Sequence, residues 1–369
     1  MLKFKKLLNL GQAARARNAR VAVTAAVAVA ALSLTGCGGS GQPSSTGGGG
    51  QKYTIGVSNA TLSQAVRVQL MDSIQKTAQE YIDKGTLNPL VIENADTDSQ
   101  GQVRQVQNLI NRGVNAIIID PSSDTALKPI LAQAEQRGIK VVAVDNSVDD
   151  PQAAQVSVDF PGNFRADADW VMKQMGGKGS LLRVDGIAGV PANQMGIDAV
   201  TAALKENPNV KLAATLNGNW DTATAVQVTS SWLASGNKPD GVWSTGGGVA
   251  YGVLQSFVSA GTNPLPPING EATAGWLRLA AKVKTEHPDF KFFVGNLIQP
   301  AAQGQAGVHV AMGLLQGKNL KDNKITLPRG EITAENFDKY VDLVKDVPDA
   351  NNVDVNNITQ DQALSLWFR

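Results

Sequence analysis

The chain has 369 residues, with 33 Lys and Arg against 32 Asp and Glu, and this length allows two domains with hydrophobic cores of their own. Six of the cations and none of the acids lie within residues 1–36, so the other 27 cations face all 32 acids and the rest of the chain is mildly acidic. Such a charge balance gives no electrostatic basis for binding nucleic acid, and no nucleic-acid partner is expected.

The first 36 residues have the pattern of an export signal. A basic segment ending at Arg20 precedes an apolar run of 14 residues, 21–34, which is short for a membrane-spanning helix. The run ends in Leu34-Thr35-Gly36-Cys37, which resembles the lipobox of bacterial lipoproteins. We therefore expect a signal peptide over 1–36 and lipidation of Cys37. The protein would be exported, and either lipid-anchored to the outer face of the cell membrane or periplasmic.

A Gly- and Ser-rich stretch, 37–51, is expected to be a flexible linker. After it, short apolar runs alternate with segments that have apolar residues at helical spacing. Such runs are typical of strands buried on both faces of a parallel sheet. The predicted order is strand 53–57, helix 66–82, strand 90–92, helix 103–110, strand 114–119, helix 126–134 and strand 139–144.

A second series of the same kind starts after residues 156–159. Its predicted elements are helix 163–175, strand 180–184, helix 195–204, strand 210–216, helix 223–233, strand 241–243, a helix ending at 260, strand 267–269, a helix from 276, strand 290–294 and helix 302–315. Beyond Gly317 the pattern weakens. Two consecutive series predict an α/β protein with two doubly wound parallel-sheet lobes.

The sequence lacks the residue groups of common catalytic and metal sites. His287 and His309 are the only histidines, Cys37 is the only cysteine, and no His, Cys and Asp group has metal-ligand spacing. The glycine runs at 176–180 and 246–248 do not fit a phosphate-binding loop. We therefore expect a protein that is no enzyme and has no cofactor and no metal site.

Polar residues gather in the loops that follow the predicted strands. Ligands of parallel α/β sheets bind at this edge, and fixed carboxylates, amides and guanidinium groups suit the hydroxyls of a neutral polyol. The candidate ligand-binding residues are Ser58, Asn59, Gln64, Arg67, Asp145, Asn146, Asn193, Trp220, Asp221, Glu271 and Gln299. Asp145 is the strongest candidate, whereas Asp120 is expected to shape a turn. Asn193 and Asp221 could instead be helix N-caps.

Four aromatic residues near the predicted strand ends or the lobe crossover could stack on a sugar ring, with core packing as an equal alternative: Phe160, Phe164, Trp220 and Trp276.

Several motifs resemble the sugar-binding proteins of ABC importers, the type I periplasmic binding family that includes ribose and galactose binders. They are Gln105-x₃-Leu109-Ile110-x₂-Gly113-Val114-x-Ala116-Ile117-Ile118, Gly138-Ile139-x-Val141-Val142-x₂-Asp145, Asp240-Gly241-Val242-Trp243 and Ile268-x-Gly270-Glu271. The resemblance covers about 53–318. It implies two lobes, joined by a three-crossover hinge, that close on one monosaccharide. The lobes would be 52–159 plus 299–326 and 160–298 plus 327–369.

The resemblance also implies roles for single residues. Asp145 matches the family's hydroxyl-binding aspartate, whereas Asn146 stands where many relatives have arginine. Asn193 and residues 246–247 depart from the family pattern. Gln299 matches the family glutamine only within a residue, so Asn296 is a further candidate for the same role.

The implied partners are a monosaccharide, an ABC permease with its ATPase, and the membrane through the lipid anchor, with the protein acting as a monomer. One alternative is a binding protein or sensor for a nucleoside or an autoinducer-2-like ligand. A sugar-processing enzyme is the least favoured alternative, because a nucleophile and a metal cluster are missing from the sequence.

Overall fold

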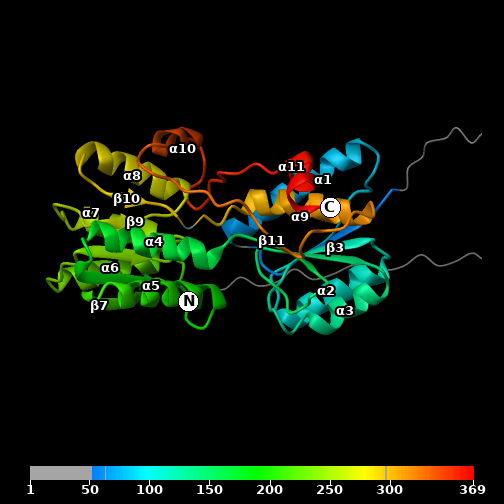
Figure 1. The fold of residues 1–369 in the computed structure, drawn as a ribbon, viewed down its shortest axis with the longest axis horizontal. Coiled ribbons are helices and arrows are strands. Elements are labelled where there is room, and N and C mark those ends of the chain that lie inside the picture. Colours follow the sequence, from blue (N-terminus) through cyan, green and yellow to red (C-terminus); the bar gives the residue numbers. More distant parts are fainter. Residues whose placement is uncertain (1–51, 63, 296) are drawn as a thin grey trace, which may run out of the picture. The chain divides into compact units, whose positions relative to one another are not determined.

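A computed structural model describes residues 52–369 apart from Ser63 and Asn296. The predicted signal peptide, Cys37 and the linker therefore lie outside the described residues. The described chain forms two α/β lobes, each built around one parallel sheet (Figure 1), which confirms the predicted fold class. None of the described helices is both long and apolar enough to cross a membrane.

The first lobe is built around a six-stranded parallel sheet with the order β2-β1-β3-β4-β5-β11. Its elements are β1 (Ile55–Asn59), α1 (Ala65–Asp83), β2 (Val91–Asn94), α2 (Ser99–Asn111), β3 (Ala116–Asp120), α3 (Lys128–Gln136), β4 (Lys140–Val144), β5 (Ala154–Ser157), α9 (Pro300–Leu315), β11 (Lys324–Thr326) and α11 (Gln360–Trp367).

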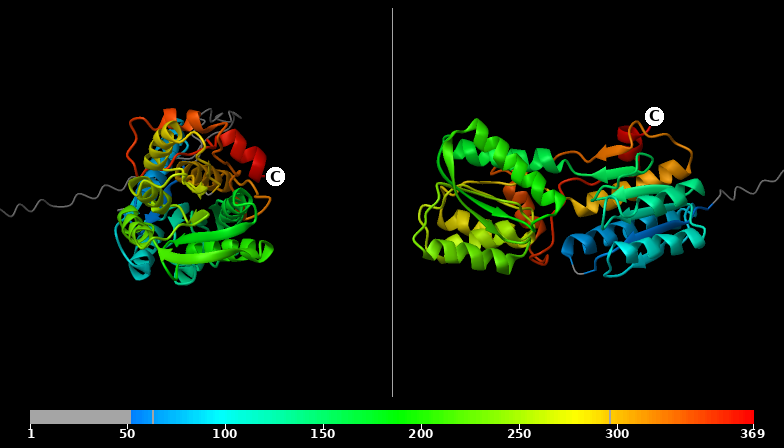
Figure 2. Two further views of the ribbon diagram at one scale, coloured as in Figure 1. Left: turned by 90° about the vertical axis from the view of Figure 1, so that its left-hand side faces the viewer. Right: turned by 90° about the horizontal axis from the view of Figure 1, so that it is seen from below.

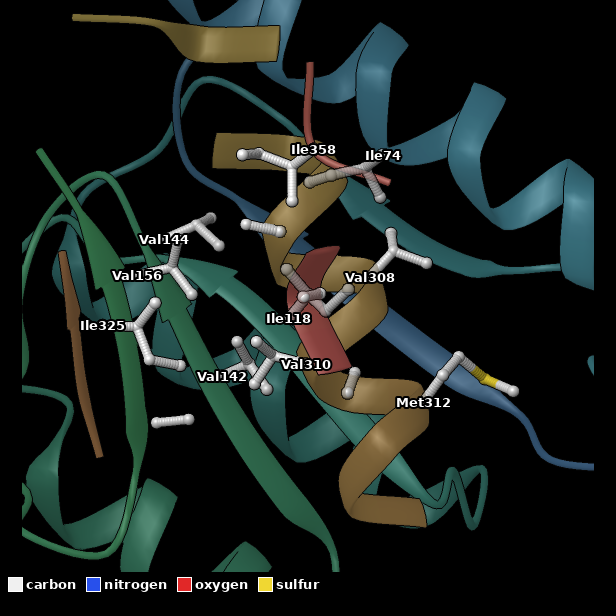
Figure 3. Close-up of a cluster of buried hydrophobic side chains, with 14 of the residues drawn as sticks. Ile74, Ile118, Val142, Val144, Val156, Val308, Val310, Met312, Ile325 and Ile358 are labelled. Atoms are coloured by element: carbon white, nitrogen blue, oxygen red, sulfur yellow. The ribbon is translucent and has the colours of Figure 1, made fainter. Parts of the chain in front are cut away.

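Helices cover both faces of this sheet, because successive strand residues point to opposite faces. Ile118 and Val144 belong to a cluster on one face with α1, α9 and α11, and Figure 3 shows this cluster around Val308 of α9. Ile117 and Ile119 belong to a second cluster with α2 and α3. Burial on both faces explains why these strands appear in the sequence as uninterrupted apolar runs.

The second lobe has a five-stranded parallel sheet with the order β7-β6-β8-β9-β10. Its elements are α4 (Phe160–Gln174), β6 (Lys178–Asp185), α5 (Pro191–Glu206), β7 (Asn209–Asn217), α6 (Thr222–Ala234), β8 (Gly241–Ser244), α7 (Val249–Ser259), β9 (Ile268–Asn269), α8 (Ala274–Glu286), β10 (Phe292–Phe293) and α10 (Phe337–Leu343). Val184 packs on the side of α7 and α8. Leu181 and Trp243 pack on the side of α4 and α5.

In its described part the chain passes between the lobes four times, and Figure 2 shows the connecting segments. The first three crossings join β5 to α4, β10 to α9, and β11 to α10. They match the three crossovers that the resemblance implies. The fourth crossing joins α10, which packs in the second lobe, to α11, which packs in the first.

The fourth crossing corrects the last part of the expected assignment of 327–369 to the second lobe: α10 lies in that lobe, but the chain after the fourth crossing lies in the first lobe. Ile358, Trp367 and Phe368 belong to the core of the first lobe, where the Phe368 ring lies against Gly313 of α9. The sequence pattern weakens beyond Gly317 because the elements there are short. They have three residues in β11, seven in α10 and eight in α11, too few for a clear periodicity.

Candidate functional site

Both sheets share one winding order, with the first strand of each lobe between the second and third. The helices that follow such neighbouring strands cover opposite faces, so their loops separate at a topological switch point. This point lies between β1 and β3 in the first lobe and between β6 and β8 in the second. Doubly wound sheets bind ligands beyond the carboxyl ends of the strands at such points.

Three charged side chains meet at the switch point of the first lobe. Arg67 lies in the first turn of α1, Asp120 ends β3 and Asp145 follows β4. The Arg67 Nη1 atom forms an ion pair with Asp120 Oδ2 and lies 3.1 Å from Asp145 Oδ2. None of the three side chains is more than 14% exposed. One guanidinium group thus holds two carboxylates in place, which fixes their positions for recognition.

Asp145 adopts a left-handed backbone conformation with φ of 64°, which is uncommon for a residue other than glycine. Its Oδ1 accepts a hydrogen bond from Gln303 Nε2 at 3.1 Å. The neighbouring Asn146 is exposed, and its Nδ2 lies 3.3 Å from Asp120 Oδ1. The structure therefore brings together three predicted residues, Arg67, Asp145 and Asn146, with two that were not predicted to bind ligand.

The residues around the end of β1 differ in their placement. Asn59 is buried, and its Nδ2 donates to Asn94 Oδ1 at 2.7 Å. It lines a small hollow together with Arg67. Gln64 is exposed and immediately precedes α1. Ser58 is fully buried and donates to Gln105 Oε1 at 2.8 Å, so this side chain connects the end of β1 to α2.

Trp220 covers the switch point of the second lobe. It lies in the loop after β7 in a left-handed conformation with φ of 53°. Its indole is half-buried and packs on Gly186, which follows β6, and on Gly247, which follows β8. A side chain at Gly186 would collide with the indole. The glycines therefore let an aromatic surface lie over the two strand ends.

The other candidates of the second lobe make hydrogen bonds within it. Asp221 is the N-cap of α6 and accepts from Thr224 N at 2.7 Å, as its alternative assignment expected. Asn193 is not an N-cap but accepts from Gly186 N at 2.7 Å. Both side chains thus shape the loops around Trp220.

Glu271 is buried and accepts hydrogen bonds from Gly248 N and Thr273 Oγ1, both at 2.8 Å. Burial raises the pKa of Glu271 to about 7, and the hydrogen bonds oppose this rise. The Glu271 carboxyl group holds the glycine turn before α7 in place. This contact lies inside the second lobe, where the Glu271 side chain is buried.

Gln299 is the N-cap residue of α9 at the second crossing, is buried, and accepts a hydrogen bond from Asn356 Nδ2 at 2.6 Å. Asn296 lies outside the described residues. Among the candidate aromatics, Trp276 is fully buried in the core of the second lobe and Phe164 is 2% exposed against Trp243. Packing is therefore the role of these two, while Phe160 is half-buried.

Two members of the first-lobe cluster were missed from the sequence. The Pro121 that follows Asp120 predicts a turn residue at this position, yet the Asp120 carboxylate pairs with Arg67. Its position at the end of a strand beside β4 is a signal that could have identified it. Gln303 offers no such signal, because its contact with Asp145 joins residues 158 positions apart.

Two lobes with this winding order and several crossings define the class of two-lobed type I binding proteins. The chain belongs to the periplasmic binding protein family: the family model described as "Periplasmic binding protein domain" matches residues 55–319.

Similar proteins agree with this assignment. The chain is 28% identical to the xylitol-binding protein of Mycolicibacterium smegmatis over 258 residues, 69% of this chain and 71% of that protein. It is 24% identical to the ribose import binding protein RbsB of Bacillus subtilis, over 75% of this chain and 86% of that one. An ABC transporter solute binding protein from Thermobispora bispora matches the structure with a TM-score of 0.71 and 26% identity, over 85% of this chain and 94% of that one.

Proposed function

We propose that this chain is the substrate-binding protein of an ABC importer, and that it captures a monosaccharide or a related polyol and delivers it to the permease. The observation that carries the proposal is the cluster of Arg67, Asp145 and Asn146 at the switch point of the first lobe. Trp220 offers an apolar surface at the matching point of the second lobe. Similar proteins named for xylitol and ribose support the same ligand class.

The charges at the two switch points favour an uncharged ligand. The Arg67 guanidinium is already shared by Asp120 and Asp145, and Arg183 Nε lies 2.9 Å from Asp185 Oδ1. An anionic ligand such as a sugar phosphate would meet these carboxylates, while both guanidinium groups are already paired with them. Hydroxyl groups both donate and accept hydrogen bonds, so they suit a carboxylate, a guanidinium and an amide at once.

Capture would proceed by closure of the two lobes. A ligand that contacts both lobes only when they are closed shifts the population toward that state. The first crossing begins after β5, which pairs with β4, and Asp145 directly follows β4. Binding at Asp145 therefore takes place close to the segment about which the lobes would move.

A panel of ligands in a thermal-shift assay tests the proposal. Ligand at one hundred times its Kd stabilises the folded state by about 2.7 kcal/mol, so the binding sugar should raise the Tm by several degrees. We expect stabilisation by one or a few neutral pentoses, hexoses or polyols, and none by sugar phosphates. Stabilisation by nucleosides or an autoinducer alone, or by none of the neutral sugars and polyols, would contradict the proposal.

We also propose that Cys37 carries a lipid that holds the protein at the outer face of the cell membrane. The apolar run 21–34, the cysteine and the linker that follows it support this. Replacing Cys37 by Ser should move the protein from the membrane fraction to the soluble exported fraction, because stable anchoring needs the covalently attached chains. Continued membrane association of Cys37→Ser would contradict the anchor.

A further inference from the structure

Gln303 is a buried polar residue whose role the family assignment leaves open. It lies in the first turn of α9 with no exposed surface. Its Nε2 donates two hydrogen bonds, to Asp145 Oδ1 at 3.1 Å and to the Ile298 carbonyl oxygen at 2.7 Å. One amide group thus connects a proposed ligand-binding carboxylate to the backbone of the second crossing.

The orientation of this amide follows from its two neighbours. A carboxylate and a carbonyl oxygen both accept hydrogen bonds, and an amide NH₂ group has two hydrogens to donate. Turning the amide around would place its oxygen against two acceptors. The Gln303 NH₂ group therefore faces Asp145 and Ile298 on chemical grounds as well as by position.

Asp145 needs such support, because its left-handed backbone is unfavourable for a residue with a side chain. The Arg67 guanidinium approaches Asp145 Oδ2 but is shared with Asp120. Gln303 approaches the other oxygen, Asp145 Oδ1. Arg67 and Gln303 thus each contact one oxygen of the Asp145 carboxylate, and together they fix its orientation.

We propose that Gln303 is a positioning residue that holds the Asp145 carboxylate in its ligand-binding orientation and couples it to the second crossing between the lobes. This inference rests on the proposed function, in which Asp145 contacts the ligand. A shift of the Ile298 backbone on lobe movement would be passed to Asp145 through one side chain.

The test compares Gln303→Leu with Gln305→Leu by calorimetric titration with the neutral sugar or polyol that stabilises the wild type. Gln305 lies on the same helix and also makes two amide hydrogen bonds, to Asn357 Oδ1 and from Ile358 N, but it does not contact Asp145. Gln303→Leu should weaken binding about ten-fold, the effect of one lost hydrogen bond to a charged group. Gln305→Leu should leave affinity within about two-fold of the wild type. Equal affinity of the two variants would overturn the inference.

A double-variant comparison separates positioning from general loss of structure. In the Asp145→Ala background, Gln303→Leu should cost less than about two-fold in affinity, because the group it positions is gone. A further ten-fold loss in that background would show that Gln303 acts elsewhere and would overturn the inference. If the wild type binds no neutral sugar or polyol, the proposed function itself fails. If the wild type and Asp145→Ala behave as proposed but Gln303→Leu binds normally, only this inference fails.

The pH dependence of ligand affinity in the variant Gln303→Glu provides a further test, because a purely structural role of Gln303 would not change it. It places a carboxylate against Asp145, in a neighbourhood that also holds Asp120, Arg67 and, at the start of α9, Asp354. Two close carboxylates repel until they share a proton. The affinity of Gln303→Glu relative to the wild type should therefore rise as the pH falls from 7 to 5. If the ratio of the two affinities does not change with pH, the contact between residue 303 and Asp145 is contradicted.

Discussion

Arg67 determines the charge balance at the switch point of the first lobe. The resemblance places an arginine at position 146 in many relatives, but this chain has Asn146 there. Arg67 approaches the same neighbourhood from α1 and pairs with Asp120 and Asp145. In this chain the guanidinium group beside the two carboxylates therefore comes from α1.

Removing the Arg67 charge should destabilise the protein. The variant Arg67→Met leaves Asp120 and Asp145 close together with exposures of 2% and 11%, and breaking a buried pair in this way costs about 3 kcal/mol. Urea denaturation at pH 7 measures the loss. Arg112→Met is the control, because Arg112 is 60% exposed at 3.7 Å from Glu93 and should cost at most about 1 kcal/mol. Equal losses of stability in Arg67→Met and Arg112→Met would contradict the buried cluster around Arg67.

His309 predicts a pH effect at the contact between α1, α9 and the C-terminal segment. Its Nε2 lies 3.0 Å from the Ile358 carbonyl oxygen, which can only accept, so Nδ1 accepts from the Tyr81 hydroxyl at 2.9 Å. Burial lowers the pKa of His309 below its ordinary value of 6.5. As the pH falls through 6.5, the unfolded chain binds a proton before the folded chain does, and the free energy of unfolding decreases.

The comparison of wild type with His309→Gln isolates this effect. Burial raises the pKa of Glu271 to about 7 and of Asp354 to about 6, but these groups titrate in both proteins. We expect the wild type to lose more stability than His309→Gln between pH 7 and pH 5.5 in denaturant titrations. A stability difference that is constant over this range would show that His309 does not titrate as described.

Among the elements of the first lobe, helix α9 is capped by a segment that lies about fifty residues further along the chain. Its N-cap residue, Gln299, makes no side-chain cap hydrogen bond. Asp354 supplies a carboxylate instead, and its Oδ1 accepts from Ala302 N at 2.9 Å. A negative charge at a helix N-terminus is favourable. The fourth crossing therefore completes the helix that carries Gln303.

The C-terminal residues should matter for stability but not for ligand recognition. Phe368 is 5% exposed and packs against Gly313, so Phe368→Ala should lower the free energy of unfolding by about 3 kcal/mol. Leu366→Ala is the control, because Leu366 is 48% exposed and its loss should cost about 0.5 kcal/mol or less. Both variants should bind ligand as the wild type does. Similar losses from the two would contradict the packing of the C-terminus in the first lobe.

How far the sequence predicts an element depends on its length and burial. The runs at 114–119 and 139–144 predict β3 and β4 because both faces of these strands are covered. The fourth crossing leaves no comparable pattern, because α11 is short and its buried residues pack on α9, far away in the sequence.

The same limit applies to the site. Asp145 can be predicted because the residue after a buried strand lies at the ligand-binding edge. Its partners depend on how distant elements pack: Arg67 approaches from α1 and Gln303 from α9. Glu271 shows that a polar residue in a strand-end loop can also make its hydrogen bonds within its own lobe, to Gly248 N.

At the scale of the molecule, the two lobes repeat one winding order and place different chemistry at equivalent points. The first lobe offers the charged and amide groups of Arg67, Asp145 and Asn146, and the second offers the indole of Trp220. A sugar ring has hydroxyls at its edge and apolar faces, so it can use both surfaces at once. We therefore expect the binding of one ligand to depend on both lobes.

Calorimetric titration of the stabilising sugar into the wild type, Asp145→Ala and Trp220→Ala tests this claim most directly, with circular dichroism to confirm that each variant is folded. We expect one site per chain in the wild type. Each variant should lose ten-fold or more in affinity, because each removes the main contact from one lobe. If either folded variant binds the sugar as tightly as the wild type, the lobe that carries the replaced residue does not contribute to the site, which would contradict a ligand held by both lobes.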